Sequence, residues 1–307
     1  SLTGVMKEDF VLFNILPGDP ARLLLPKGRF QADMIPKQRE AFHLDEPLYM
    51  QFARYWVDTP QLRFGYSWKE KRPVTEVVGE RIWPTVLLVG VGTLVSVVIG
   101  FFTGVIAGWR RNSTYDVVST NTGMVLYSMP SFWVAMLAIQ IFAVALGWFP
   151  VGKMEAPGVV YPSWFAHSSS ILWHMILPVV IFGITYAGEY HLIMRSSLTG
   201  VMKEDFVLTA RAKGLSDDKV LWRHTVPNAL LPSVTLIMMN FGFVLSGAIL
   251  IETVFDWPGL GLLSWEALSW RDFPVLRAVF LLGAIAVIIF NLIADILYYY
   301  LDPRVQA

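Results

Sequence analysis

Five long apolar runs constrain this chain more than any other feature of its sequence. They occupy residues 84–109, 117–147, 171–194, 228–254 and 275–301. A helix that crosses a bilayer needs about 20 predominantly apolar residues, and each run is long enough. Only 16% of the 307 residues are charged and 55% are hydrophobic, whereas about 25% of the residues of a soluble domain are charged. The sequence therefore predicts an all-α membrane protein.

Basic residues in the loops predict how these runs are oriented. Arg110 and Arg111 lie between the first two runs, and the loop 195–226 is rich in Arg and Lys. Because positively charged loops stay on the cytoplasmic side of a membrane, we expect both loops inside the cell. The polar region 17–83 is then an external segment, and the C-terminus is cytoplasmic.

The first twelve residues, SLTGVMKEDFVL, recur letter for letter at 197–208. An external segment in a chain that starts inside the cell needs a preceding span, and only 1–16 could supply it. That length makes a helix of roughly 24 Å, too short for a roughly 30 Å bilayer core. Lys7 and Asp9 at its centre would each cost about 2.5–3.5 kcal/mol. We interpret 1–16 as a remnant of a first membrane helix, or as a misassigned one, with 1–12 not native; a true local duplication is the alternative.

The second copy of the repeat lies in a stretch with helix start and stop signals. Residues 202–213 are expected to be helical up to Gly214, because glycine often adopts the left-handed conformation just past a helix end. Ser216 can cap a second helix, and two aspartates follow it in the first turn, where the helix dipole favours negative charge. Pro227 is expected to end or kink that helix. The sequence thus predicts a bent, mostly polar helix pair on the cytoplasmic side.

Small and basic residues give this helix pair an edge that a partner protein could contact. Ala210, Ala212 and Gly214 would let another backbone approach closely, while Arg211 and Lys213 could reach acidic or carbonyl groups. The pair is therefore a candidate docking element. The alternative is a surface hairpin that only joins two spans.

The stretch LTARAKGLSDDKVLWRHTVPNALLP at 208–232 resembles the cytoplasmic coupling loop of ABC importer permeases. The general pattern of that loop is Glu-Ala-Ala, three residues and Gly. Leu208 and Thr209 replace the Glu and the first Ala here, whereas Ala210 and Gly214 match. TARAKGL is similar to the variant found in the peptide/nickel branch of the family. Four further segments also resemble that branch: LPGDPA (16–21), YSMPSFWVA (127–135), ETVFDWPGLGLL (252–263) and NLIADILYYYLDPR (291–304).

This resemblance implies a fold and a set of partners. The expected fold is a type I ABC importer transmembrane domain, with six helices of which the first is poorly encoded here. Residues 84–307 would form the permease domain, with its coupling loop at 195–226. The chain would lie among the lipids of a prokaryotic cytoplasmic membrane and bind no cofactor itself. Its partners would be a second homologous permease subunit, two ATPase subunits that carry ATP and Mg, and an extracytoplasmic substrate-binding protein.

The resemblance also implies a function and a docking site. The chain would move peptides from the binding protein across the membrane by alternating access, and oligosaccharides or nickel chelates are the alternative substrates. The residues expected to contact an ATPase subunit are Glu204, Asp205, Thr209, Ala210, Arg211, Ala212, Lys213, Gly214 and Leu215.

Polar residues at membrane depth are the candidates for the translocation pathway, because such groups are costly in a bilayer and usually functional. The alternative is that each makes a hydrogen bond between helices, worth about 0.6 kcal/mol on average. The candidates are Tyr127, Ser128, Gln140, Glu189, Asn240 and Ser246.

Motifs for chemistry are missing from the sequence. It contains no GxxxxGK[ST] phosphate loop, no HExxH zinc motif and no cysteine, and its five histidines are scattered. We therefore expect a non-catalytic subunit and disfavour a membrane-embedded enzyme. A channel or secondary carrier is a further alternative, although such carriers often show inverted repeats and the repeat here is one short copy. The net charge of zero argues against nucleic acid as a partner.

Overall fold

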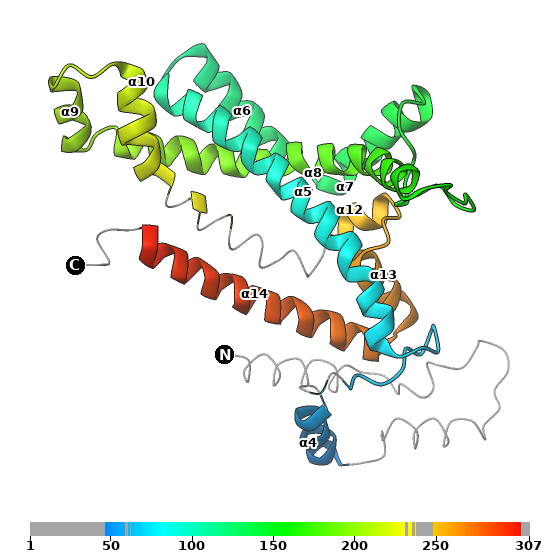
Figure 1. Cartoon of the computed structure of the whole chain (residues 1–307). Helices are drawn as coiled ribbons and strands as arrows, with labels where there is room; N and C mark the ends of the chain where they lie inside the picture. Colours follow the sequence, from blue (N-terminus) through cyan, green and yellow to red (C-terminus); the bar gives the residue numbers. More distant parts are fainter. Residues whose placement is uncertain are drawn as a thin grey trace, which may run out of the picture.

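The structure is a computed structural model, and it describes residues 47–58, 61, 63–230, 233, 234, 237 and 248–301. These residues are almost entirely helical, and their one β-bridge joins Tyr66 to Pro73. Three long helices form the body of the molecule (Figure 1): α5 (Val74–Trp109), α8 (Trp164–Val201) and α14 (Phe273–Leu301). A shorter helix, α4 (Leu48–Asp58), precedes them. The prediction of an all-α fold is thus confirmed for the part of the chain that the structure describes.

Three of the five predicted spans are confirmed as long helices. Within the described residues, α5, α8 and α14 are each long and apolar enough to cross a membrane. All three are longer than the apolar runs that predicted them, α14 by only two residues. α5 begins ten residues before Pro84, and α8 extends from Trp164 to Val201, beyond both ends of 171–194. Charged residues such as Glu76 lie in these extensions because a helix can continue past the bilayer with exposed polar side chains.

The second predicted span is not one continuous helix. It is divided into α6 (Thr114–Ser128), α7 (Ser131–Ala138) and a π-helical turn, η2 (Ile139–Ala145). The chain bends by 96° between Ser128 and Ser131. Met129 is extended, with ψ 137°, because a residue before proline is pushed out of the helical region. Pro130 therefore breaks the predicted span into two helices.

The fourth predicted span, 228–254, lies largely outside the described residues. Its described end is not a continuation of one long helix, because Ala248 is non-helical and a separate short helix, α12 (Ile249–Val254), follows it. A turn through Trp257 then leads into α13 (Leu260–Trp270). The prediction of a continuous helix to Val254 is therefore wrong at this end.

The second helix of the predicted cytoplasmic helix pair also differs from expectation. α10 (Asp217–Lys219) passes directly into a π-helical turn, η3 (Val220–Thr225), and residues 226–230 are helical. Pro227 therefore does not end the helix. Ser216 occupies the expected cap position with an extended backbone, but its side chain makes no capping hydrogen bond.

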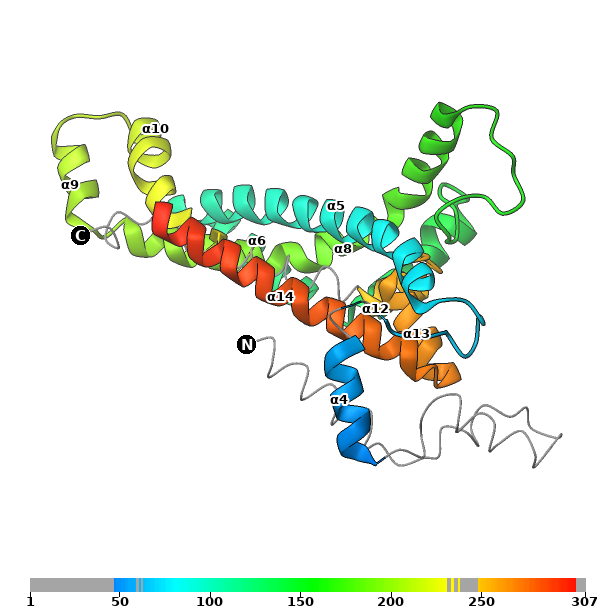
Figure 2. The same ribbon diagram turned by 60° about the horizontal axis from the view of Figure 1, so that its bottom comes forward.

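α5 and α8 pack tightly along their length because small residues face the contact. Gly92, Gly100, Gly104 and Gly108 of α5 are spaced by four or eight residues and lie against α8. A Cβ on Gly104 would lie 2.7 Å from the carbonyl oxygen of His191. Such small-residue contacts let two membrane helices approach closely. Figure 2 shows the two helices side by side.

The ends of the molecule carry different elements (Figures 1 and 2). One end, called the α9 end below, carries α9 (Asp205–Ala212) and α10; the other, the α13 end, carries α12 and α13. α14 starts at the α13 end, where Val275 and Leu276 pack with the first turns of α5 and with α13. It finishes at the α9 end.

Candidate functional site

α9 is a short, separate helix that follows α8 at the α9 end. α8 ends at Val201, and three residues, Met202 to Glu204, turn the chain before α9 begins at Asp205. Glu204 is extended, and Asp205 places a negative charge in the first turn, where the helix dipole favours it. The copy of the repeat at 197–208 is thus divided between the last turn of α8, this turn and the start of α9.

The end of α9 is closed by two backbone hydrogen bonds around Gly214. The Leu215 N–H donates to the Ala210 carbonyl at 3.4 Å, and the Gly214 N–H donates to the Arg211 carbonyl at 2.9 Å. This pair of bonds is the Schellman motif, which needs a left-handed residue just past the helix. Gly214 has φ 74°, so the expected left-handed stop is confirmed.

One face of α9 is buried against the rest of the chain. Val207 is 0% exposed and Ala210 is 5% exposed, and both pack with Val220. The Arg211 guanidinium lies over the ring of Trp109, the last residue of α5, at 5.4 Å from the ring centre. α9 is therefore anchored to the end of α5 as well as to α8.

The opposite face of α9 is exposed and partly apolar. Phe206 is 38% exposed and Leu208 is 55% exposed, although both are large hydrophobic residues. We call this exposed set the outer face of α9; it comprises Glu204, Asp205, Phe206, Leu208, Thr209, Ala212 and Lys213. Ala210 belongs to the buried face and Leu215 is half-buried against it, so neither is part of the outer face.

An ion pair at the same end joins α6 to α8. The Arg195 guanidinium donates to both carboxylate oxygens of Asp116, through Nε and, at 2.9 Å, through Nη2. The Asn112 N–H donates to the same carboxylate at 2.9 Å. The Asp116 side chain is 2% exposed, so its charge is shielded from solvent and fully engaged by donors. Two residues 79 positions apart in sequence therefore fasten the first turn of α6 to the end of α8.

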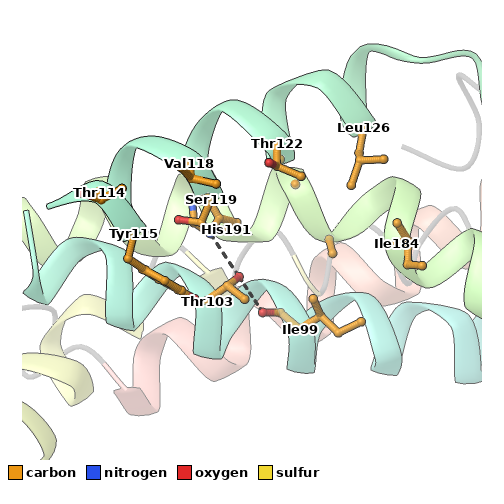
Figure 3. Close-up of a pocket in the computed structure, with 13 residues that line it drawn as sticks. Ile99, Thr103, Thr114, Tyr115, Val118, Ser119, Thr122, Leu126, Ile184 and His191 are labelled. Atoms are coloured by element: carbon orange, nitrogen blue, oxygen red, sulfur yellow. Dashed lines mark hydrogen bonds between the residues drawn. The ribbon is translucent and has the colours of Figure 1, made fainter. Parts of the chain in front are cut away.

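His191 continues this polar network one turn further along α8. Its ring nitrogens lie 3.2 Å from the Thr120 hydroxyl of α6 and 3.1 Å from the Thr103 hydroxyl of α5. The Thr103 hydroxyl donates to the Ile99 carbonyl. Figure 3 shows His191 and Thr103 at the wall of a pocket of about 460 Å³ between α5, α6 and α8, whose lining is otherwise mostly apolar.

Comparison with known proteins identifies the family of this chain. Residues 100–307 match the family described as binding-protein-dependent transport system inner membrane component. Three relatives, each named glutathione transport system permease protein GsiC, are 37% identical to the chain over 298 residues. They come from Escherichia coli K12, Shigella dysenteriae serotype 1 and Salmonella paratyphi A, and each alignment covers 97% of this chain and 92% of the relative. The chain belongs to this permease family.

Family membership confirms the predicted class of protein. The chain is a permease subunit of an ABC importer of the peptide/nickel type, located in the inner membrane, and its role is translocation rather than catalysis. Permeases of this family act together with a binding protein, as the family description states. Within the residues that the structure describes, no group of three His, Asp or Glu side chains could hold a metal ion.

The structure describes four of the six predicted pathway residues of this permease. Tyr127 at the end of α6 and Glu189 of α8 form one cluster, because a Cβ on Gly188, next to Glu189, would lie 3.1 Å from the Cβ of Tyr127. Ser128 is exposed, and its hydroxyl donates to the Met124 carbonyl of its own helix at 2.7 Å. Gln140 is exposed in η2, away from that cluster in sequence. Asn240 and Ser246 lie outside the described residues.

Sequence reasoning missed the two exposed hydrophobic residues of α9. The signal was present, because Val207 and Ala210 are three residues apart and therefore share one face of a helix. Phe206 and Leu208 flank Val207 and must lie on other faces. The exposed side of α9 therefore carries one large hydrophobic residue at each edge. The sequence analysis instead weighted the small residues, of which Ala210 is buried.

Proposed function

We propose that this permease subunit imports short peptides together with a second homologous permease, two ATPase subunits that carry ATP and Mg, and an extracytoplasmic binding protein. The observation that carries the proposal is the outer face of α9, which presents Phe206 and Leu208 beside the charged residues Asp205 and Lys213. Phe206 and Leu208 lie at opposite edges of this face, because residues two apart in a helix point in different directions, so a partner that covers the whole face would bury both.

The proposed orientation places the α9 end in the cytoplasm. Basic residues gather at that end, including Arg110, Arg111, Lys203 and Lys213, and basic loops stay on the cytoplasmic side. α14 finishes at the same end, which supports the proposal that the C-terminus is cytoplasmic. The external segment 17–83 and the α13 end would then face the binding protein.

α9 is built to pass movement from an ATPase subunit to the spans. It contacts α5 through Trp109 and follows α8 after a turn of three residues. Its buried face is tightly packed, because Val207 is fully buried. α5 and α8 are themselves packed through small residues, and the ion pair between Asp116 and Arg195 adds α6. When two ATPase subunits close on ATP, a push on α9 would therefore move α5, α6 and α8 together, which is the rocking motion that alternating access requires.

Peptides are the proposed substrates because the relatives at 37% identity carry the name of a glutathione transport permease. Oligosaccharides and nickel chelates are the alternatives within this branch. In the proposed division of the chain, 84–307 is the translocating domain and 195–226 its coupling loop. Tyr127, Ser128, Gln140, Glu189, Asn240 and Ser246 are retained as proposed pathway residues.

The proposal is tested by ATP hydrolysis of the whole complex in lipid nanodiscs. The complex is co-expressed with its ATPase subunits and its binding protein, and hydrolysis is measured with reduced glutathione, with tri-alanine or with cellotriose. Peptide-dependent stimulation is expected. Stimulation by cellotriose alone would replace the substrate class, and failure of any ATPase to co-purify would refute the docking role of α9.

A variant pair sharpens this test. Phe206→Ala with Leu208→Ala removes the exposed hydrophobic part of α9 while leaving its buried face intact, and the ATPase is expected to dissociate during purification. Val160→Ala is the matched control, because Val160 is 93% exposed in the loop before α8 and far from α9 in sequence. Equal ATPase recovery from both variants would contradict the proposed docking surface.

A further inference from the structure

Glu252 is a buried carboxylate that the docking role of α9 does not use. It lies in α12 at the α13 end and is 0% exposed. Among the ion pairs of the described residues, none includes Glu252. A buried carboxylate is costly unless hydrogen bonds replace its hydration, so its partners show what it does.

Three of the donors to the Glu252 carboxylate come from two other helices. The Thr85 hydroxyl of α5 donates to Oε1 at 2.9 Å. The Gly261 and Leu262 N–H groups, in the first turn of α13, donate to Oε2 at 2.7 Å and 3.1 Å. The Leu260 N–H donates to the Thr85 hydroxyl at 2.7 Å. One carboxylate and one hydroxyl thus satisfy three backbone donors that the start of α13 would otherwise leave without partners.

The turn between α12 and α13 is shaped around this carboxylate. A Cβ on Gly259 would overlap both the Glu252 carboxylate and the Thr85 hydroxyl, and a Cβ on Gly261 would lie 2.8 Å from the Cα of Ile249. Trp257, in the same turn, is 0% exposed, and its indole N–H donates to the Pro84 carbonyl of α5 at 2.8 Å. α12, the turn and α13 are therefore held against α5 at two adjacent residues, Pro84 and Thr85.

α13 is also tied to the polar segment that precedes α5. The Lys69 ammonium pairs with Glu266 of α13 at 2.9 Å, and the Ser67 hydroxyl donates to Asp272 just after α13. The ring of Trp68 stacks edge-on against Phe273 at 5.6 Å. Segment 63–73 continues directly into α5 at Val74. α13 is therefore tied to α5 both through this segment and through the contacts of Glu252 and Thr85.

We propose that Glu252 and Thr85 are positioning residues for transport, which lock α12 and α13 to α5 so that docking of the loaded binding protein at the α13 end is transmitted along α5. This inference rests on the proposed function. A cation site at Glu252 is disfavoured by the same geometry, because both of its oxygens already accept hydrogen bonds from N–H or O–H donors that would repel a cation.

The test compares Thr85→Val, which removes the hydroxyl at nearly constant volume, with Thr85→Ser, which keeps it. Thr93→Val is the matched control, since Thr93 is also buried on α5, at 3% exposure, two turns away. ATP hydrolysis by the complete complex in nanodiscs is measured with and without binding protein loaded with glutathione. Thr85→Val is expected to reduce the stimulation by binding protein about tenfold, the effect of losing a hydrogen bond to a charged group. Basal hydrolysis is expected to stay unchanged. Thr85→Ser and Thr93→Val are expected to keep the full stimulation.

Full stimulation in Thr85→Val, or an equal loss in Thr93→Val, would overturn the inference.

A second measurement tests the contact between α5 and α13 without any partner protein. Because the chain has no cysteine, spin labels can be placed at Thr75→Cys on α5 and Ser269→Cys on α13, both exposed positions. The label distance distribution is expected to broaden in Thr85→Val and not in Thr85→Ser. An unchanged distance distribution in Thr85→Val would show that Thr85 does not hold α13 to α5, and would overturn the inference. If the distribution broadens as expected but the binding protein does not stimulate the wild-type complex, only the proposed function is refuted.

Discussion

Substitution of Gly214 tests whether the turn that closes α9 determines the rigidity of this proposed docking helix. Gly214 has φ 74°, and a Cβ built on it would meet no heavy atom within 4 Å. The cost of a side chain there is therefore conformational and involves no steric overlap with neighbours. A left-handed conformation costs an ordinary residue about 1–2 kcal/mol; Asn tolerates it better and a β-branched residue worse. The expected order of destabilisation is Asn, then Ala, then Val.

Hydrogen exchange of the complex in nanodiscs measures this order locally. The Gly214 and Leu215 amides close the end of α9, and their exchange reports opening of that turn. For Gly214→Ala, a cost of about 1–2 kcal/mol corresponds to exchange faster by roughly 5- to 30-fold. Gly214→Val should exceed this and should also uncouple ATP hydrolysis from transport, or release the ATPase from the complex.

Gly200 provides the control for this series. It lies in the last turns of α8, where a Cβ likewise meets nothing within 4 Å, but its φ is not positive. Gly200→Ala is expected to leave exchange unchanged or to slow it, because Ala is favoured over Gly inside a helix by up to about 1 kcal/mol. Wild-type exchange in Gly214→Val, or an Asn variant as unstable as the Val variant, would refute the reasoning. Normal transport by Gly214→Val would refute the docking role.

Three further changes test the packing at the α9 end. Asp116→Asn removes the anionic partner of Arg195 and should lower the free energy of unfolding by about 2–3 kcal/mol. Thermal melting of a double-mutant cycle with Arg195→Gln measures the coupling energy of the pair, and a value near zero would contradict this prediction. Gly104→Val places a side chain against the His191 carbonyl and Met194 and should cost about 1–3 kcal/mol, whereas Gly90→Ala, with open space around it, should melt like the wild type. Trp109→Leu removes the ring beneath Arg211 and should speed hydrogen exchange in α9 but not in the middle of α8; uniform acceleration would point to global destabilisation instead.

Several features of this permease could be predicted from local sequence because their causes are local. A long apolar run predicts a spanning helix, since burial of apolar side chains and internal backbone hydrogen bonding act within the segment itself. The runs that became α5, α8 and α14 follow this rule. Gly214 stops α9 and Pro130 interrupts the second run because glycine and proline act on their own backbone dihedral angles and those of their nearest neighbours. The resemblance of 208–232 to a coupling loop also depends on residues close in sequence.

Other features were decided only by contacts between distant segments. Which face of α9 is outer depends on Val220 and Trp109, so the sequence could not show that Ala210 is buried while Leu208 is exposed. The size of the bend at Pro130, 96°, depends on how α6 and α7 pack against α8.

Two of the buried carboxylates, Asp116 and Glu252, show the same division most clearly. Asp116 and Arg195 are 79 residues apart, and Thr85 and Glu252 are 167 residues apart. No local pattern links either pair, because a polar partner is selected by burial in the folded molecule, where an unpaired charge is costly, and not by spacing along the chain. The sequence by itself determined that this chain is a helical permease and that a short helix ends at Gly214; only the tertiary structure decided which side of that helix is exposed and which buried pairs hold the helices together.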